Sequence, residues 1–284
     1  MAVDARLGYL QALAAVGLFS TSPVLIRWAG GLSAIEITFW RLALATATVL
    51  VFGALAGRPV RWRRLPHRQF AAYGAVVALH FFLYIASLFF TSVAHSLALV
   101  YTAPLFIALL SRVALDERLP ARKWLGVAIA VAGVGVLAGF EPDLSLRTLA
   151  GDALAAGSAV TFAIYSVIGR ARRAAYSLFE YAAGVYGWGA LWLLPLAIWQ
   201  APGSRYDGPA ALALLGLGVG PLGTGHTLYN AALRRIPATF ANLIATLEVV
   251  GGVALSALLL GELPSPTSLL GAAIVLAGIL VVVL

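Results

Sequence analysis

Polar side chains recur at helical spacing inside stretches of this sequence that are otherwise apolar. His80, Tyr84, Ser87 and Thr91 stand at i, i+4, i+7 and i+11, which places them in one stripe along an α-helix. Such a stripe combines ring faces with hydrogen-bond donors and acceptors. This combination suits an amphiphilic, ring-bearing solute, which stacks through its apolar face while Tyr, His and Asn hold its polar ends.

Similar polar groups occur in several other apolar stretches. They are Ser20, Thr21 and Ser22; Tyr101 and Thr102; Ser158, Thr161 and Tyr165; His226, Tyr229 and Asn230; and Thr239, Asn242 and Thr246. Polar side chains are costly in hydrocarbon, so by default they face a cavity or a neighbouring helix. The sequence therefore predicts a substrate-binding cavity lined by His80, Tyr84, Ser87, Tyr101, Thr161, Tyr165, His226, Tyr229, Asn230, Asn242 and Thr246.

A simpler interpretation stays open for many of these residues. Ser and Thr hydroxyls can bond back to carbonyls of their own helix, and Tyr can anchor a helix at the membrane surface. For the Ser and Thr residues, packing is the stronger expectation. For Tyr84, Tyr229, Asn230 and Asn242, the cavity is the stronger expectation.

Two charged residues, Arg41 and Glu248, stand inside apolar stretches and are candidates for a structural charge pair or for coupling to an ion. Glu248 is about 200° around a regular helix from Thr246, so we expect it to face away from the cavity stripe. Pairing with a cation or polar neighbour is one hypothesis for Glu248, and proton coupling is another. Arg41 is the cation within a span that an anionic substrate would need.

Composition indicates where these side chains must reside. Of 284 residues, 62% are apolar and 11% are charged, against about 25% charged in an average soluble domain. Apolar runs of about 20 residues, long enough to cross a bilayer as helices, fill the chain. We predict an all-α polytopic membrane protein with ten spans and no separate soluble domain. The spans are placed at 8–28, 34–56, 69–91, 94–115, 121–140, 150–169, 179–200, 208–232, 239–260 and 266–284.

The basic residues predict how the chain is oriented. Most of the 19 Lys and Arg residues, including Arg6, Arg58, Arg118, Arg170 and Arg234, fall in loops on one side of the predicted spans. By the positive-inside rule this side is cytoplasmic, and both termini lie there. The net charge of +8 is therefore explained by membrane orientation, and no nucleic-acid partner is expected.

The sequence also repeats itself at a displacement of about 145 residues. The phrase "VALDERLPARKWLGVA" near Glu117 returns as "LLLGELPSPTSLLGAA" around Glu262, and Tyr84 falls on Tyr229. We therefore divide the chain into residues 1–144 and 145–284. Each half holds five predicted spans, an odd number, so the second half is expected to lie inverted in the membrane, as in many transporters.

The repeated segments resemble the two EamA-type repeats of the drug/metabolite transporter superfamily. Residues of the first copy that match are Pro104, Glu117, Gly126, Ala132 and Gly133, and those of the second are Glu262, Gly271, Ala277 and Gly278. The second copy has Val249 where a proline is expected, which puts a proline hinge there in doubt. The resemblance implies a central cavity surrounded by spans 1, 3, 4, 6, 8 and 9, with spans 2, 5, 7 and 10 peripheral or interfacial.

Several other functions are disfavoured by the sequence. "GVGPLG" at 218–223 fits a dinucleotide fingerprint, but it lies in an apolar span and follows no strand. Its glycines and Pro221 are expected to allow close packing or to break the helix. No phosphate-binding loop for ATP occurs, the chain has no Cys, and the histidines lack metal spacing. Neither a metal nor a cofactor is therefore expected, and an intramembrane enzyme or a channel is a weaker alternative.

These observations predict a secondary transporter in a bacterial-type inner membrane, with a small molecule and the lipid bilayer as its partners. Among the members of the superfamily, the chain most resembles YddG-type exporters of aromatic amino acids. Export of aromatic or other neutral amino acids by alternating access is the function that this resemblance implies. Transport of another metabolite or of a lipophilic cationic drug is the alternative, and a monomer is compatible with the sequence.

Overall fold

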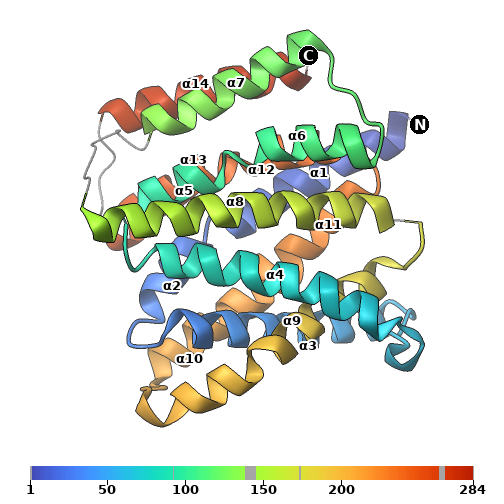
Figure 1. The fold of residues 1–284 in the computed structure, drawn as a ribbon, viewed down its shortest axis with the longest axis vertical. Coiled ribbons are helices and arrows are strands. Elements are labelled where there is room, and N and C mark those ends of the chain that lie inside the picture. Colours follow the sequence, from blue (N-terminus) through green and yellow to red (C-terminus); the bar gives the residue numbers. More distant parts are fainter. Residues whose placement is uncertain (1, 92, 138–144, 173, 262–265, 284) are drawn as a thin grey trace.

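The computed structural model describes residues 2–91, 93–137, 145–172, 174–261 and 266–283. Within these residues the chain is helical and contains no strand. Its elements are α1 (Ala2–Phe19), α2 (Ser22–Trp28), α3 (Ala34–Leu55), η1 (Trp62–Arg64), α4 (His67–Ser87), α5 (Val93–Val100), α6 (Ala103–Ala114), α7 (Ala121–Leu137), α8 (Leu146–Arg172), α9 (Leu178–Gln200), η2 (Ala201–Gly203), α10 (Gly208–Leu217), η3 (Gly218–His226), α11 (Thr227–Leu233), α12 (Ala238–Ala245), α13 (Leu247–Leu260) and α14 (Pro266–Val283). Figure 1 shows these helices running roughly alongside one another in a layered bundle.

Eight segments of the described chain are long and apolar enough to cross a membrane. They are Asp4–Trp28, Ala34–Leu55, His67–Ser87, Ser96–Ala114, Leu146–Arg172, Leu178–Gly203, Gly208–Leu233 and Ala238–Leu260. The remaining predicted spans, 121–140 and 266–284, coincide with α7 and α14. The polytopic helical architecture is confirmed, whereas the count of ten spans stays a prediction. In Figure 1, α1 begins and α14 ends on the same side of the bundle.

Three of the long apolar segments are interrupted near their middle. A turn at Ser20 and Thr21 separates α1 from α2, and one at Tyr101 and Thr102 separates α5 from α6. In both cases a proline stands in the first turn of the second helix, Pro23 in α2 and Pro104 in α6, where its missing N–H costs little. These prolines allow a new helix to start inside an apolar segment.

The third interruption, at Thr246 between α12 and α13, occurs without a proline. The Thr246 hydroxyl donates to the carbonyl of Leu243, and its backbone N–H is shared between the Asn242 and Leu243 carbonyls. Val249 N then donates to Thr246 O at 3.1 Å, a tightened i→i+3 bond. Threonine bonding back to its own helix favours such a bend. The helix is thus interrupted near Val249, the position where the sequence lacks the expected proline.

Gly218–His226 adopts a π-helix between α10 and α11, with Pro221 inside it. The Thr224 hydroxyl donates to the carbonyl of Val219, five residues earlier, at 2.8 Å. Proline removes one donor from the helical ladder, and wider π-turns are a frequent response in membrane helices. The expectation that Pro221 and its glycines disturb this span therefore agrees with the structure.

Helices α7 and α14 pack against each other at the outer edge of the bundle (Figure 1). Their contact depends on two glycines: a Cβ on Gly133 would lie 2.6 Å from Val275 N, and one on Gly278 would lie 2.4 Å from Ala130 N. Real Cβ atoms do not approach backbone so closely, so these sites require glycine for close helix packing.

Replacing Gly133 with Ala is therefore expected to destabilise the protein by about 1–3 kcal/mol, the usual cost of overpacking. Gly135 provides the matched control, because a Cβ there meets nothing within 4 Å. Thermal unfolding in detergent should show a lower midpoint for Gly133→Ala and an unchanged or higher one for Gly135→Ala. Equal midpoints for the two variants would show that α7 and α14 are not held in close contact.

Candidate functional site

A small enclosed cavity lies near the middle of the bundle, where several helices contribute one to three side chains each. Its walls are Phe19, Arg41, His80, Phe81, Tyr84, Leu97, Val100, Tyr101, Phe162, His226 and Glu248. These residues come from α1, α3, α4, α5, the turn after α5, α8, η3 and α13. The cavity measures about 20 Å³, whereas pockets that hold drug-sized ligands have about 300–1,000 Å³. This conformation is therefore occluded, and the walls must separate before an organic solute can enter.

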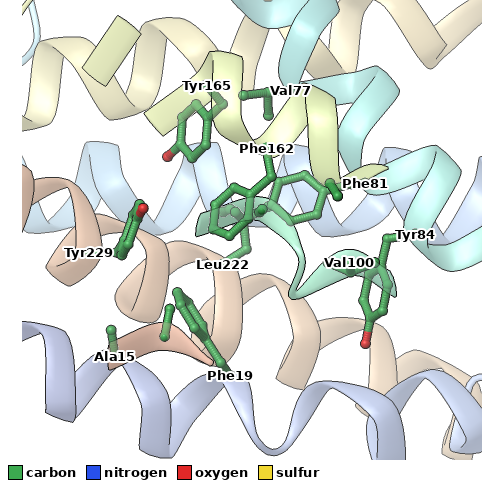
Figure 2. Packing of buried hydrophobic residues seen from close by; sticks show 14 of the residues in the cluster. Ala15, Phe19, Val77, Phe81, Tyr84, Val100, Phe162, Tyr165, Leu222 and Tyr229 are labelled. Atoms are coloured by element: carbon green, nitrogen blue, oxygen red, sulfur yellow. The ribbon is translucent and has the colours of Figure 1, made fainter. Parts of the chain in front are cut away.

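Aromatic rings form most of one side of the cavity. The Phe19 and His226 rings lie 4.3 Å apart, and His226 meets Phe81 edge-on at 5.0 Å. Phe162 stacks on His80 with centroids 4.8 Å apart and planes 15° from parallel. Figure 2 shows Phe19, Phe81 and Phe162 converging from different helices on the same space. Rings arranged in this way offer stacking surfaces to a solute that displaces them.

His80 is held in place by Ser158 of α8. Its Nδ1 lies 3.0 Å from the Ser158 carbonyl and 2.9 Å from the Ser158 hydroxyl, while that hydroxyl also reaches the His80 carbonyl at 3.1 Å. A carbonyl can only accept, so the geometry favours a proton on Nδ1. In the neutral ring, Nε2 is then the acceptor that remains for a ligand.

Two opposite charges occupy the cavity wall. Arg41 is 2% exposed; its Nη1 donates to Ser22 Oγ at 3.1 Å, and its guanidinium lies 4.5 Å from the centre of the Phe81 ring. Glu248 accepts a hydrogen bond from the Tyr101 hydroxyl. Both residues line the same cavity, but no ion pair joins them in the described part of the chain.

The position of Glu248 corrects the expectation that it faces away from the cavity. That expectation assumed that Thr246, about 200° around the helix from Glu248, faces the cavity. Thr246 instead bonds back to the Leu243 carbonyl and does not line the cavity, whereas Glu248, in the first turn of α13, does. The charge belongs to the site itself.

Arg41 corrects a second expectation, that the span at 34–56 is only peripheral or interfacial. Helix α3 supplies Arg41 to the cavity, and α9, another span expected at the periphery, supplies the buried Tyr186 to a polar network beside it. By contrast α7 and α14, expected to be peripheral, do lie at the edge of the bundle (Figure 1).

Three of the predicted cavity residues form that neighbouring network instead of lining the cavity in this conformation. Asn230 Nδ2 lies 2.6 Å from the Tyr165 hydroxyl and 3.2 Å from the Tyr186 hydroxyl. The Tyr229 hydroxyl pairs with Ser166 Oγ at 2.8 Å. The rings of Tyr165 and Tyr229 still lie 6.2 and 5.6 Å from Phe162, so the network borders the cavity. Figure 2 shows both phenols on the same side of Phe162.

The remaining predicted residues lie away from the cavity wall. The hydroxyls of Ser87, Thr161 and Thr246 donate to carbonyls of their own segments, at Tyr84, Gly157 and Leu243, and Ser87 also contacts Ser96 Oγ at 2.6 Å. In this structure these three residues therefore follow the alternative hypothesis, in which Ser and Thr pack within their own segments and do not line a cavity. Asn242 is fully buried, and its amide makes no hydrogen bond of regular geometry with the described residues.

The apolar residues of the cavity wall were not predicted from the sequence. Phe19, Phe81 and Phe162 are cavity residues, as are Leu97 and Val100. A phenylalanine in an apolar span gives no signal of its own, because the same residue type also faces lipid or packs in the core. The stripe spacing offered a partial signal, since Phe81 lies three residues before Tyr84 and Phe162 three residues before Tyr165, on the same helix face.

Arg170 joins three segments at one end of the bundle through hydrogen bonds. Arg170 Nε lies 2.7 Å from Glu117 Oε1, with the two side chains 12% and 23% exposed, and Arg170 Nη1 donates to the Leu233 carbonyl at 2.9 Å. Arg170 therefore ties the end of α8 to α11 and to the loop after α6. Glu262, the repeat counterpart of Glu117, lies outside the described residues.

A second cluster joins α3 to the α9–α10 connection. Glu36 accepts from the Ser33 hydroxyl at 2.8 Å and from the Tyr206 hydroxyl at 2.7 Å, while Ser33 also bonds Gln200. Desolvation raises the pKa of Tyr206, and its bond to Glu36 acts in the same direction. Tyr206 therefore remains a protonated donor at neutral pH.

A bundle of apolar helices around an occluded, aromatic and charged cavity is the arrangement of a membrane transporter. The EamA-like transporter family matches the chain at residues 6–139 and again at 149–284. The protein belongs to this family, a branch of the drug/metabolite transporter superfamily, and it is a multi-pass membrane transporter.

Known relatives include named amino acid exporters. The chain is 31% identical to a probable terminal-alkyne amino-acid exporter of Streptantibioticus cattleyicolor, over 89% of this chain and 83% of that one. It is 29% identical to the threonine/homoserine exporter RhtA of Escherichia coli (strain K12), over 85% and 79% of the two chains. A solved crystal structure with 23% identity superimposes with a TM-score of 0.84 over 96% of this chain and 95% of that one, which shows a shared fold.

Proposed function

We propose that this protein exports neutral amino acids, aromatic ones among them, across the inner membrane of a bacterial-type cell. The observation that carries the proposal is the enclosed cavity, which combines aromatic rings with charged and hydrogen-bonding groups. Relatives named as amino acid exporters support the substrate class. The chain has no phosphate-binding loop, so we assign the driving force to a gradient and give the protein no catalytic role.

The proposed mechanism is alternating access between two inverted repeats, residues 1–144 and 145–284, with ten spans and both termini cytoplasmic. Several features support the division. The family matches each half separately, and capping boxes of the same kind begin α3 at Ser33 and Glu36 and α9 at Ser177 and Glu180. Helix breaks also recur at Tyr101 and Thr246, 145 residues apart.

The alternative substrate is a lipophilic cation or another metabolite. One observation favours a cation: Glu248 lies in a wall that also contains aromatic rings, and both attract positive charge. Arg41 in the same wall repels a cation, which is why we rank this function second. Counterflow of labelled Phe and Thr against a lipophilic cation, in proteoliposomes, should show saturable exchange of the amino acids.

A single cysteine at Val100 tests whether the cavity is on the transport path. The chain contains no Cys, so a variant carries exactly one thiol. A methanethiosulfonate reagent should inactivate Val100→Cys at least tenfold, because the attached group fills the occluded cavity, and saturating substrate should protect it. Val113→Cys, 87% exposed on α6, should keep full activity. Inhibition of both variants, or of neither, would place the transport path elsewhere.

A further inference from the structure

We propose that Arg41 and Glu248 together recognise one zwitterionic α-amino acid, Arg41 binding its carboxylate and Glu248 its ammonium group. The inference deepens the proposed function and rests on it. It makes these two residues the determinants of specificity for the charged end of the substrate. The aromatic rings are then left to accommodate the substrate's side chain.

Arg41 has unused capacity for an anion. A guanidinium carries five N–H donors in a planar fork that matches a carboxylate. In the described structure, one Arg41 nitrogen donates to Ser22 and the guanidinium lies over Phe81, while the buried Nε has no hydrogen-bond partner. Tyr84 and His226, which also line the cavity, each bury one polar atom without a bond of regular geometry. These atoms add donors or acceptors next to the guanidinium.

Glu248 has the complementary requirement. Its carboxylate accepts from Tyr101, and its place in the first turn of α13 puts it near backbone N–H dipoles that favour an anion. A hydroxyl and a helix end stabilise negative charge without neutralising it. A primary ammonium group, with three donors, would neutralise it.

The two charges need a bound partner because they do not neutralise each other directly. A buried charge without a countercharge is costly, and Arg41 and Glu248 share the cavity without forming an ion pair. A zwitterion supplies both countercharges at once. An amine would leave Arg41 unpaired, and an acid would leave Glu248 unpaired, so each is expected to bind less well than the amino acid.

The same charge balance predicts which side chains are tolerated. Beyond Arg41 and Glu248, the cavity wall consists of aromatic, apolar and histidine side chains, including Phe19, Phe162 and Leu97. An additional charge on the substrate's side chain would find no countercharge there. Neutral amino acids are therefore expected to compete well, and Asp, Glu, Lys and Arg poorly.

The wild-type protein can test this without any substitution. In proteoliposomes that exchange labelled Phe, unlabelled Phe should compete at a concentration at least ten times lower than phenethylamine or 3-phenylpropionate. N-acetyl-Phe and Phe methyl ester, which remove one charge each, should also compete poorly. If the single-charge analogues compete as well as Phe, the inference is wrong even though amino acid transport is correct.

Two variants assign the groups individually. Arg41→Gln should remove most of the advantage of Phe over phenethylamine, and Glu248→Gln should remove most of its advantage over 3-phenylpropionate. Arg27→Gln, an exposed arginine of α2, is the control and should keep the wild-type order. Arg41→Lys, which retains the charge, should keep the order with weaker binding. A uniform loss for all ligands with the order unchanged would refute the assignment.

Three other outcomes distinguish zwitterion recognition from the absence of amino acid transport, from cation transport and from proton coupling by Glu248. If the protein exchanges no amino acid at all, the proposed function fails first; if it exchanges phenethylamine better than Phe, the cation alternative replaces it. If Glu248 serves proton coupling instead, Glu248→Gln should flatten the pH dependence of transport without changing the order of the analogues. Should both variants fail to fold, the comparison of analogues on the wild-type protein still decides.

Discussion

Replacing Arg170 with Glu is expected to reduce transport at least tenfold and to open one end of the bundle. Arg170 joins α8 to Glu117 at 2.7 Å and to the Leu233 carbonyl at 2.9 Å. The pair is largely shielded from water, so reversing one charge sets two carboxylates against each other at short range. A change of about 1.4 kcal/mol shifts a two-state equilibrium tenfold, and this substitution should exceed it.

The prediction has a conformational readout as well as a kinetic one. In an Arg170→Glu background, a cysteine at Val100 should react faster with a reagent added from the side on which Arg170 lies. Combining Glu117→Arg with Arg170→Glu should restore part of the transport and slow the labelling. Arg172→Glu, two residues further along α8, loses only an exposed hydrogen bond to the Tyr73 hydroxyl and should change neither quantity. If Arg172→Glu changes transport and labelling as much as Arg170→Glu does, the net charge at this end of the bundle matters and the pair of Arg170 with Glu117 does not.

Replacing Asn230 with Leu is expected to give the largest loss of stability among single substitutions near the cavity. Asn230 holds the hydroxyls of Tyr165 and Tyr186 and so links α11 to α8 and α9. Leucine would remove the amide partner of both buried hydroxyls, at about 1–3 kcal/mol for each in proteins generally. Within a bilayer such bonds are worth less, about 0.6–1.7 kcal/mol, so a total of about 1–3 kcal/mol is expected.

Conservative tyrosine substitutions serve as the matched controls for Asn230. Tyr165→Phe and Tyr186→Phe each remove one of the two hydroxyls and leave the ring packing unchanged. Each should lower the thermal midpoint by less than Asn230→Leu, and the double substitution in an Asn230→Leu background should recover part of the loss. A recovery is expected because the buried hydroxyls that lost their amide partner are then gone. No recovery would mean that the shape of Asn230, and not its hydrogen bonds, is what the site requires.

Glu248 and Arg41 could be identified from the sequence as unusual residues, but the directions of their side chains could not. Both were recognisable from the sequence because a charge inside an apolar run of membrane length is rare and costly. Their directions were not recognisable. Thr246 and Glu248 lie on different sides of their segment, and the packing of the neighbouring helices places the side with Glu248 at the cavity.

The polar stripes show the same limit in another way. His80, Tyr84, Tyr101 and His226 line the cavity, whereas Tyr165, Tyr229 and Asn230 bond to one another or to Ser166 and Tyr186. Spacing along a helix predicts which side chains lie on the same face. It does not state whether that face meets a cavity or another polar face, because this depends on how far apart the neighbouring helices pack.

A polytopic helical membrane protein of the EamA type can be predicted from the sequence alone, because apolar length, glycine and proline positions and the repeated signature are local properties of the chain. The costly polar and charged residues inside the apolar segments are recognisable in the same way. Which of these residues meet is visible only in the folded protein, as are the completion of the wall by Phe19, Phe81 and Phe162 and the shared cavity of Arg41 and Glu248, which form no ion pair. These are relations between helices far apart in the sequence, and they depend on packing distances and on helix breaks that no periodicity contains.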